Sequence, residues 1–317
     1  MNSFKGNYPY LLLILANMIW GGNFVIGRVA ADYFPPLTFS LLRWLLAFLV
    51  LSLFMRNRLK SDWRILRNHK WILLLLSVTG IAGYNTIIYF SLHYTTSINA
   101  AVVNSTTPLF ITFFSVFILK EKLNSYQGVG IIVSIIGVAF ILSKGALQSL
   151  QSFSFNQGDL FVVVAVIFWA IYSVIIKKYS TVLPTLTTLY ITSFVGVLFL
   201  LPLSLLELNH SNQSVLIQPF SVFIILYVGI LASIIAFLSW NIGVSKIGAS
   251  KSGVFLNLLP VFATIFATVF TDENLYWYQI VGGFIVVSGV ILSSKKSKGN
   301  SKHEKAKHSN YHSLKAD

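Results

Sequence analysis

Ten apolar segments, each about long enough to cross a membrane as a helix, make up most of this chain. A spanning helix needs about 20 mostly apolar residues, because every backbone amide inside the hydrocarbon must find its partner within the helix. The segments cover residues 8–30, 36–55, 71–93, 97–119, 125–142, 159–176, 184–206, 219–242, 247–270 and 275–293. The pattern predicts an all-α integral membrane protein with ten transmembrane helices.

The composition excludes several other classes of protein. Only 10% of the residues are charged and 56% are hydrophobic, whereas a soluble domain carries about 25% charged residues. The chain has no Cys, and its six His show no paired spacing, so we expect no metal site and no cofactor. It has no GxxxxGK[ST] motif and no clustered nucleophile and base, so we expect neither nucleotide hydrolysis nor an enzyme.

The basic residues determine the expected orientation. If the ten segments alternate across the membrane, 20 of the 23 Lys and Arg residues fall on one side. Short basic loops stay in the cytoplasm, so both termini are expected there. This distribution accounts for the net charge of +14 without a nucleic-acid partner. The expected partners are the lipid bilayer and a small-molecule substrate.

The second half of the chain repeats the first. After a shift of 152 residues, 12 of the 35 positions in 108–142 are identical to those in 260–294. An offset of 149 pairs Trp20 with Trp169. Each copy holds five segments, an odd number, so the second copy must enter the membrane in the opposite orientation. The matched pairs include Pro108/Pro260, Glu121/Glu273, Gly130/Gly282 and Gly137/Gly289.

The predicted domains follow from this duplication. They are a cytoplasmic N-terminus (1–7), a first repeat (8–142), an external linker (143–158), a second repeat (159–294) and a basic, disordered cytoplasmic tail (295–317). Two inverted repeats can exchange conformations and so open one central site to either side in turn. This arrangement predicts a secondary transporter that works by alternating access.

Pro108 and Pro260 occupy equivalent positions within their predicted spans. A proline inside a helix removes an amide donor, and interrupted helices at corresponding positions of two repeats point to a substrate site. We therefore predict a helix break at each proline. A kink that a neighbouring helix repairs is the alternative.

Several short motifs, taken with the repeat, resemble one transporter family. They are the Trp20–Gly21–Gly22–Asn23–Phe24 stretch, Arg43 in the second span, the span with Asn and Pro, and Lys120–Glu121–Lys122–Leu123 before the fifth span. Together they resemble the EamA-type members of the drug/metabolite transporter (DMT) superfamily. The resemblance implies a multi-pass protein of the bacterial cell membrane that exports amino acids or related metabolites. It also implies a cavity lined by the first, third, fourth, sixth, eighth and ninth helices.

Arg43 is the one ionisable residue well inside a predicted span. A charge there costs at least about 2.5 kcal/mol unless it faces a polar cavity or a partner. One interpretation is contact with an anionic group such as a substrate carboxylate. The other is a structural role, in which the guanidinium caps helix carbonyls or pairs with Asp32.

Further polar and aromatic residues within the spans are candidates for substrate binding. Rings offer stacking area and amides bond to both amino and carboxyl groups, so the set suits a neutral or zwitterionic molecule. Hydrogen bonding between helices is the competing explanation. The candidates are Asn17, Trp20, Asn23, Tyr84, Asn85, Tyr89, Asn99, Asn104, Trp169, Tyr172, Trp240, Asn241 and Asn257.

Two smaller groups have expected structural roles. Glu121 and Glu273 precede the fifth and tenth spans, where a carboxylate complements the free amides of a helix start. Aromatic residues near predicted span ends are expected to anchor the protein at the membrane–water interface. The anchors are Tyr10, Trp44, Trp63, Trp71 and Trp277.

The predicted function is transport of a small organic metabolite, an amino acid or related zwitterion, in the direction of export. A flippase for a lipid or lipid-linked intermediate is the alternative, with Arg43 on the phosphate. No acidic residue lies deep in a span, so proton antiport, facilitated exchange and downhill export all stay open.

Overall fold

Every regular element that the structure describes is a helix. The structure is a computed structural model, and it describes residues 4–30, 33–55, 57–91, 94, 103–143, 145, 157–210, 215, 217–270 and 276–294. The α-helices are α1 (Phe4–Ala30), α2 (Pro36–Ser52), α3 (Arg58–Asn68), α4 (Lys70–Leu76), α5 (Tyr84–Ser91), α7 (Thr107–Phe114), α8 (Ser125–Leu142), α10 (Gln157–Tyr179), α11 (Thr185–His210), α12 (Pro219–Leu226), α13 (Ala236–Ile247), α14 (Ala249–Gly253), α15 (Leu258–Phe270) and α16 (Trp277–Ser294).

Four short segments of other helix types join or extend these helices. Three are π-helical: η1 (Ser77–Gly83) joins α4 to α5, η2 (Ser115–Leu119) extends α7, and η3 (Tyr227–Ile235) joins α12 to α13. The fourth is a 3₁₀ turn, η4 (Val254–Asn257), between α14 and α15. Gly80 in η1 and Gly229 in η3 are 149 residues apart, so the π-helical segments lie at equivalent positions of the two repeats.

Six helical runs in the described ranges are long and apolar enough to cross a membrane. Four shorter apolar helices accompany them, and each of the ten predicted segments overlaps one of these ten helices. The number that cross the membrane stays a prediction. The six runs are Asn7–Gly27, Lys70–Ile88, Gln157–Tyr179, Thr185–His210, Pro219–Ile247 and Ala249–Phe270.

Helix starts follow local sequence signals. Pro36 and Pro219 each begin a helix, where the missing amide would have had no partner. At α8, the Asn124 side chain accepts from the Tyr126 amide at 3.0 Å, and the Gln127 side chain accepts from the Asn124 amide at 2.9 Å. This reciprocal cap fixes the start of α8.

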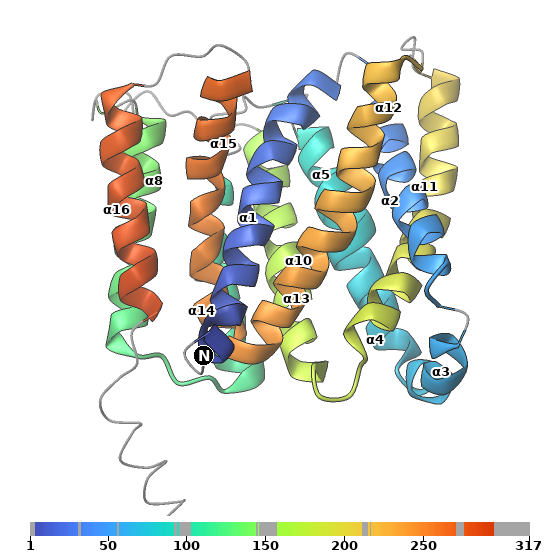
Figure 1. Ribbon diagram of the computed structural model, residues 1–317, viewed down its shortest axis with the longest axis horizontal. Coiled ribbons are helices and arrows are strands. Elements are labelled where there is room, and N and C mark those ends of the chain that lie inside the picture. Colours follow the sequence, from blue (N-terminus) through green and yellow to red (C-terminus); the bar gives the residue numbers. More distant parts are fainter. Residues whose placement is uncertain are drawn as a thin grey trace, which may run out of the picture.

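The helices form one bundle with a matched pair at each end. In Figure 1, α8 and α16 stand side by side at the left, and α2 and α11 stand at the right. Between them, α1 packs against α13 and α15, while its repeat counterpart α10 packs against α5 and α7. Likewise α2 contacts η3 and α11 contacts η1. Exchanging the two halves of the chain therefore reproduces the contacts between helices.

The α8–α16 interface is built on glycines. A Cβ on Gly130 would lie 2.6 Å from the carbonyl oxygen of Gly289, and one on Gly137 would lie 2.9 Å from that of Gly282. Small residues let helix backbones approach closely. Gly282 is the repeat equivalent of Gly130, and Gly289 is that of Gly137, so the antiparallel pair has an internal two-fold axis. It passes between Ser134 and Val286, whose hydroxyl and carbonyl oxygens are 3.3 Å apart.

Carboxylates bind threonines near both ends of the α2–α11 pair instead, one of them from the neighbouring helix α3. Glu207, near the end of α11, accepts the Leu37 and Thr38 amides of α2 at 3.0 and 2.7 Å, and the Thr38 hydroxyl at 2.9 Å. At the other end, the Thr187 hydroxyl donates to Asp62 of α3 at 2.6 Å. Thr38 and Thr187 are 149 residues apart, so equivalent threonines meet carboxylates at both ends.

Both prolines lie in the first turn of a helix, and the irregular backbone precedes them. Pro108 is the second residue of α7, after a turn at 105–106. Pro260 is the third residue of α15, directly after η4. The Thr107 hydroxyl donates to the carbonyl of Asn104 at 2.5 Å. That bond partners the carbonyl that the proline ring would otherwise leave free.

Two structural expectations need correction. Trp44 was predicted at the membrane interface, but it is fully buried with its ring 4.9 Å from that of Phe237. The other correction concerns the helix that Glu121 caps. It accepts from the amides of Ala249 and Ser250 and from the Ser250 hydroxyl, at 3.2, 3.3 and 2.8 Å. Glu121 therefore caps α14 in the other repeat, whereas α8 is capped by Asn124 and Gln127.

Candidate functional site

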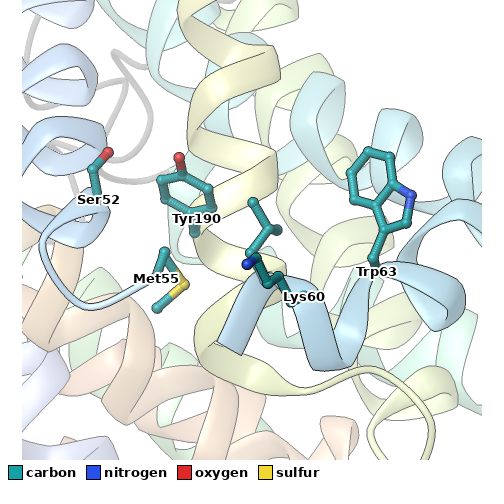
Figure 2. A pocket seen from close by; sticks show the side chains of 6 residues that line it. Ser52, Met55, Lys60, Trp63 and Tyr190 are labelled. Atoms are coloured by element: carbon teal, nitrogen blue, oxygen red, sulfur yellow. The ribbon is translucent and has the colours of Figure 1, made fainter. Parts of the chain in front are cut away.

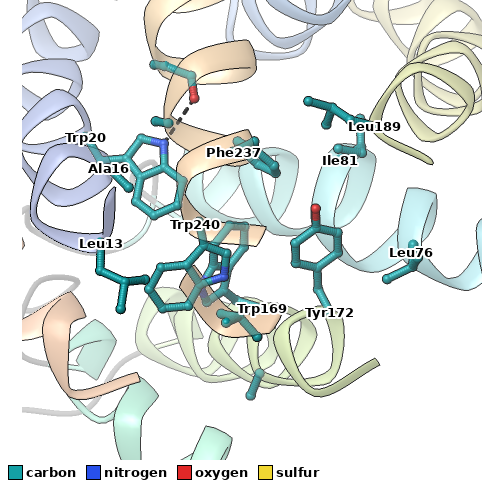
Figure 3. Close-up of a cluster of buried hydrophobic side chains, with 14 of the residues drawn as sticks. Leu13, Ala16, Trp20, Leu76, Ile81, Trp169, Tyr172, Leu189, Phe237 and Trp240 are labelled. Atoms are coloured by element: carbon teal, nitrogen blue, oxygen red, sulfur yellow. Dashed lines mark hydrogen bonds between the residues drawn. The ribbon is translucent and has the colours of Figure 1, made fainter. Parts of the chain in front are cut away.

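Aromatic side chains from four helical elements meet at the centre of the bundle, and Figure 3 shows those from α1, α10 and α13. The ring of Trp169 lies 5.3 Å from that of Trp20, 5.2 Å from Tyr172, 5.9 Å from Trp240 and 5.0 Å from Tyr84. All except Tyr84 are buried. The sequence-predicted aromatic candidates with described side chains thus form a single cluster.

Trp20 and Trp169 are equivalent residues of the two repeats, and they contact each other. Their rings meet edge to face at an interplanar angle of 85°. A contact between equivalent residues lies on the axis that exchanges the two halves. The axis found at the α8–α16 interface therefore also passes through the aromatic cluster, which occupies the centre of the two-fold arrangement.

The π-helical segment η3 supplies a shared acceptor to this region. The amide of Ala236 bonds to the carbonyl of Leu231, five residues back, so the Ala232 carbonyl does not receive the amide that an α-helix would give it. It accepts from Trp20 Nε1 at 3.0 Å and from the Arg43 guanidinium at 3.2 Å. Segments of this type are frequent at functional sites.

Arg43 is buried, with an exposed fraction of 2%. Its Nε donates to the Ser233 hydroxyl at 2.5 Å, and its Nη1 lies 3.3 Å from the Asn85 side-chain oxygen. Together with the Ala232 carbonyl, these partners on α5 and η3 accept hydrogen bonds from the guanidinium. In this conformation Arg43 joins α2 to α5 and η3, and its contact with a substrate anion stays a proposal.

Other amide candidates are paired with aromatic hydroxyls. Tyr172 and Asn241 exchange hydrogen bonds at 3.1 and 2.9 Å. The Tyr84 hydroxyl donates to Asn104 at 3.2 Å. A small pocket of about 10 Å³, the size of one water molecule, lies beside Asn241 between α10, α11 and α13. These pairs connect helices around the ring cluster.

A second group of candidates has buried polar atoms that no hydrogen bond satisfies within the part of the chain that the structure describes. They are Oδ1 of Asn17, Oδ1 of Asn23, both side-chain polar atoms of Asn257, and Nε1 of Trp169. Leaving such an atom without a partner costs about 1–3 kcal/mol. Asn17 is three residues from Trp20, and α1 packs against η4, which carries Asn257. These groups are therefore available to a ligand near the rings.

Some of the predicted residues fall outside the described residues, and two residues that were not predicted belong to the site. Asn99 and the side chain of Tyr89 fall outside the described residues, as do Asp32 and Glu273. Phe237 and Ser233 were not predicted. Phe237 is one of many Phe residues in an apolar run, and nothing in the sequence distinguishes it. Ser233 is the repeat equivalent of Tyr84, a signal that could have identified it.

The fold and its centre define a class of protein. An all-helical bundle with six runs long enough to cross the membrane, and with polar groups enclosed at its centre, is a polytopic membrane protein. A sequence model of the EamA-like transporter family matches residues 7–143 and 156–295. The chain belongs to that family, as the resemblance of its motifs implied.

Individual relatives agree with this assignment. The chain is 30% identical to the uncharacterized transporter YetK of Bacillus subtilis, over 91% of this chain and 87% of that protein. It is 27% identical to the uncharacterized transporter YyaM of the same species, over 90% and 93%. A solved crystal structure, 21% identical, matches 90% of this chain and 96% of its own with a TM-score of 0.74, which supports the fold. The protein is a membrane transporter.

Proposed function

We propose that this protein is a secondary transporter that moves a small organic metabolite by alternating access. We further propose that the chain crosses a bacterial cell membrane ten times, as two inverted repeats with both termini in the cytoplasm. The observation that carries it is the exchange relation between the halves, in which Trp20 meets Trp169 and the paired glycines of α8 and α16 interchange. Two halves with equivalent contacts can exchange conformations around a central site.

The proposed substrate is an amino acid or a related zwitterion, and the proposed direction is export. The unsatisfied atoms of Asn17, Asn257 and Trp169 include both donors and acceptors, so they can bond to an ammonium group and a carboxylate. The neighbouring rings add stacking area. Asn17 and Asn257 are at most 1% exposed, and such an enclosed location favours a small substrate over a lipid.

Arg43 has a positioning role in this proposal. It links α2 to η3 and α5 through Ser233 and Asn85. A substrate carboxylate that replaced the Asn85 oxygen, the longest of these bonds, would convert that link into a charge-assisted one. Arg43→Ala is therefore expected to lower transport while the protein still inserts into the membrane.

The test is uptake of radiolabelled neutral, aromatic and branched amino acids into proteoliposomes, with and without an imposed proton gradient. We expect saturable flux, reduced at least ten-fold by Asn257→Ala and unchanged by Ser193→Ala. Ser193 is equally buried, but its hydroxyl bonds within its own helix at 2.7 Å. A gradient-dependent rate would identify proton coupling. Absence of flux for the whole panel would contradict the substrate class and favour the lipid-flippase alternative.

The topology has its own test, because the chain contains no Cys. Thr187 and Asn209 lie near opposite ends of α11, 22 residues and thus roughly 33 Å apart. That length matches the hydrocarbon core. Ser61 of α3 is exposed at the Thr187 end. We expect Ser61→Cys to react only from the cytoplasm and Asn209→Cys only from outside, and reversed labelling would overturn the orientation.

A further inference from the structure

A pocket of about 490 Å³ opens on the flank of the bundle, away from the aromatic cluster. Its lining comes from the end of α2, the following loop, α3 and α11 (Figure 2). Small-molecule sites have volumes of roughly 300–1,000 Å³, so the pocket has the size of a binding site. The lining residues are Ser52, Met55, Leu59, Lys60, Trp63 and Tyr190.

The short helix α3 gives the pocket its charge. Its sequence, RLKSDWRILRN, carries four basic residues and one acidic residue. The acidic residue, Asp62, is bonded to Ser61 and to Thr187 of α11, so it anchors α3, and within the described ranges it forms no ion pair with a lysine or arginine. Leu66, on the same helix, is buried. Helix α3 is thus amphipathic, with Leu66 packed inward and its basic residues exposed.

Exposed tryptophans beside the pocket indicate that it lies at the boundary between membrane and water. Trp63 is 54% exposed and Trp71, just beyond α3, is 71% exposed, and exposed Trp residues of a membrane protein gather at that boundary. Lys60 is exposed, and among the described residues no ion pair engages its ammonium group. The pocket therefore combines a free cation and two hydroxyl groups with an apolar wall of Met55 and Leu59.

We propose that this pocket binds the headgroup of an anionic phospholipid. The Lys60 ammonium group would contact the phosphate, the hydroxyl groups of Ser52 and Tyr190 would take the glycerol region, and the first acyl carbons would follow Met55 and Leu59. Basic residues on an interfacial helix attract anionic lipids. The occupant is a resident lipid and not a transported one, because Ser52 is nine residues along α2 from Arg43, or roughly 13 Å.

The inference does not depend on the identity of the transported substrate. Its test is native mass spectrometry of the full-length protein from detergent micelles that contain phosphatidylglycerol or phosphatidylcholine. We expect one phosphatidylglycerol molecule to bind more tightly than phosphatidylcholine. Lys60→Gln is expected to weaken phosphatidylglycerol binding about five-fold. Arg64→Gln is the matched control, because Arg64 is an exposed basic residue of α3 that does not line the pocket.

A second variant tests the contribution of the pocket's shape to lipid binding separately from that of its charge. Ser52→Phe places a ring in the pocket and keeps every basic residue, so it is expected to reduce phosphatidylglycerol binding as strongly as Lys60→Gln. Equal losses in Lys60→Gln and Arg64→Gln would show a general basic surface and overturn the proposal, as would no loss in Lys60→Gln. Equally tight binding of soluble glycerol 3-phosphate would overturn the lipid as occupant. Thermal unfolding of each variant checks that the protein is folded.

Discussion

The two ends of the bundle are held together in different ways. At one end, α8 and α16 meet backbone to backbone through four glycines, with a Ser134–Val286 hydrogen bond between them. At the other end, Glu207 of α11 binds Thr38 of α2, and Asp62 of α3 binds Thr187 near the opposite end of α11. Both pairs obey the same two-fold relation. The first depends on shape and the second on polar contacts.

This difference indicates which end can rearrange. Packed interfaces have discrete arrangements and resist sliding, so α8–α16 is suited to stay together through a transport cycle. Hydrogen bonds at helix ends can be exchanged with water at little net cost, so the ends of α2 and α11 can separate. We expect substitutions in the glycine interface to alter stability most and those at the threonines to alter it less.

The largest expected effect is that of Gly289→Val. A Cβ at this position would lie 2.6 Å from the backbone nitrogen of Ser134, and backbone cannot move aside as a side chain can. Overpacking of this kind costs about 3 kcal/mol. Unfolding by SDS in mixed micelles would measure the loss. Gly128→Ala is the control, because Gly128 lies on the partner helix α8 and no described atom lies within 4 Å of the new Cβ. Similar losses in both variants would refute the tight interface.

Glu207→Ala should have the next largest effect. It removes the acceptor of two backbone amides and the Thr38 hydroxyl at the start of α2. Loss of a helix cap costs about 1–2 kcal/mol. The same unfolding assay applies, and Glu207→Gln should recover part of the loss because its amide oxygen can still accept. No recovery would show that the charge of Glu207, and not its hydrogen bonds, stabilises this end.

Thr187→Val should have a smaller effect than Glu207→Ala. The change keeps the side-chain shape but removes the hydroxyl that donates to Asp62 at 2.6 Å, a bond worth about 1 kcal/mol. Thr181→Val, an exposed residue before α11, should leave stability unchanged. A loss at Thr187 as large as that at Gly289 would mean that the two ends do not differ as the contacts indicate.

Ser134→Ala is expected to have the smallest effect. It removes one long hydrogen bond, at 3.3 Å, from an interface that depends on close packing. The expected loss is about 0.5 kcal/mol, again by SDS unfolding. A loss above that of Glu207→Ala would show that polar contact, and not glycine packing, holds α8 to α16.

The helices could be predicted from the sequence to a large extent, but their partners could not. The start of α8 follows from Asn124 and Gln127, because both halves of that cap lie within four residues. The partner of Glu121 depends on the arrival of α14 from the other repeat. Trp44 was misplaced for the same reason, since its burial depends on Phe237 of α13.

The centre of the molecule shows the same limit. The equivalence of Trp20 and Trp169 is visible in the sequence, but their mutual contact is not. The π-helical geometry of η3 cannot be predicted from an apolar run. It depends on which carbonyl each backbone amide bonds to, and no pattern of residues indicates that. The shared use of the Ala232 carbonyl by Trp20 and Arg43 therefore appears only in the structure.

The axis through α8 and α16 has an evolutionary consequence. In a dimer of identical chains, a residue on the axis must face its own copy, so a serine would face a serine. Here the two positions belong to one chain and hold Ser134 and Val286, and a single hydroxyl donates across the axis. Joining the halves into one polypeptide allows the two sides to diverge. Such divergence can make the inward- and outward-facing states unequal in energy, which no symmetric pair could do by mutation of a single gene.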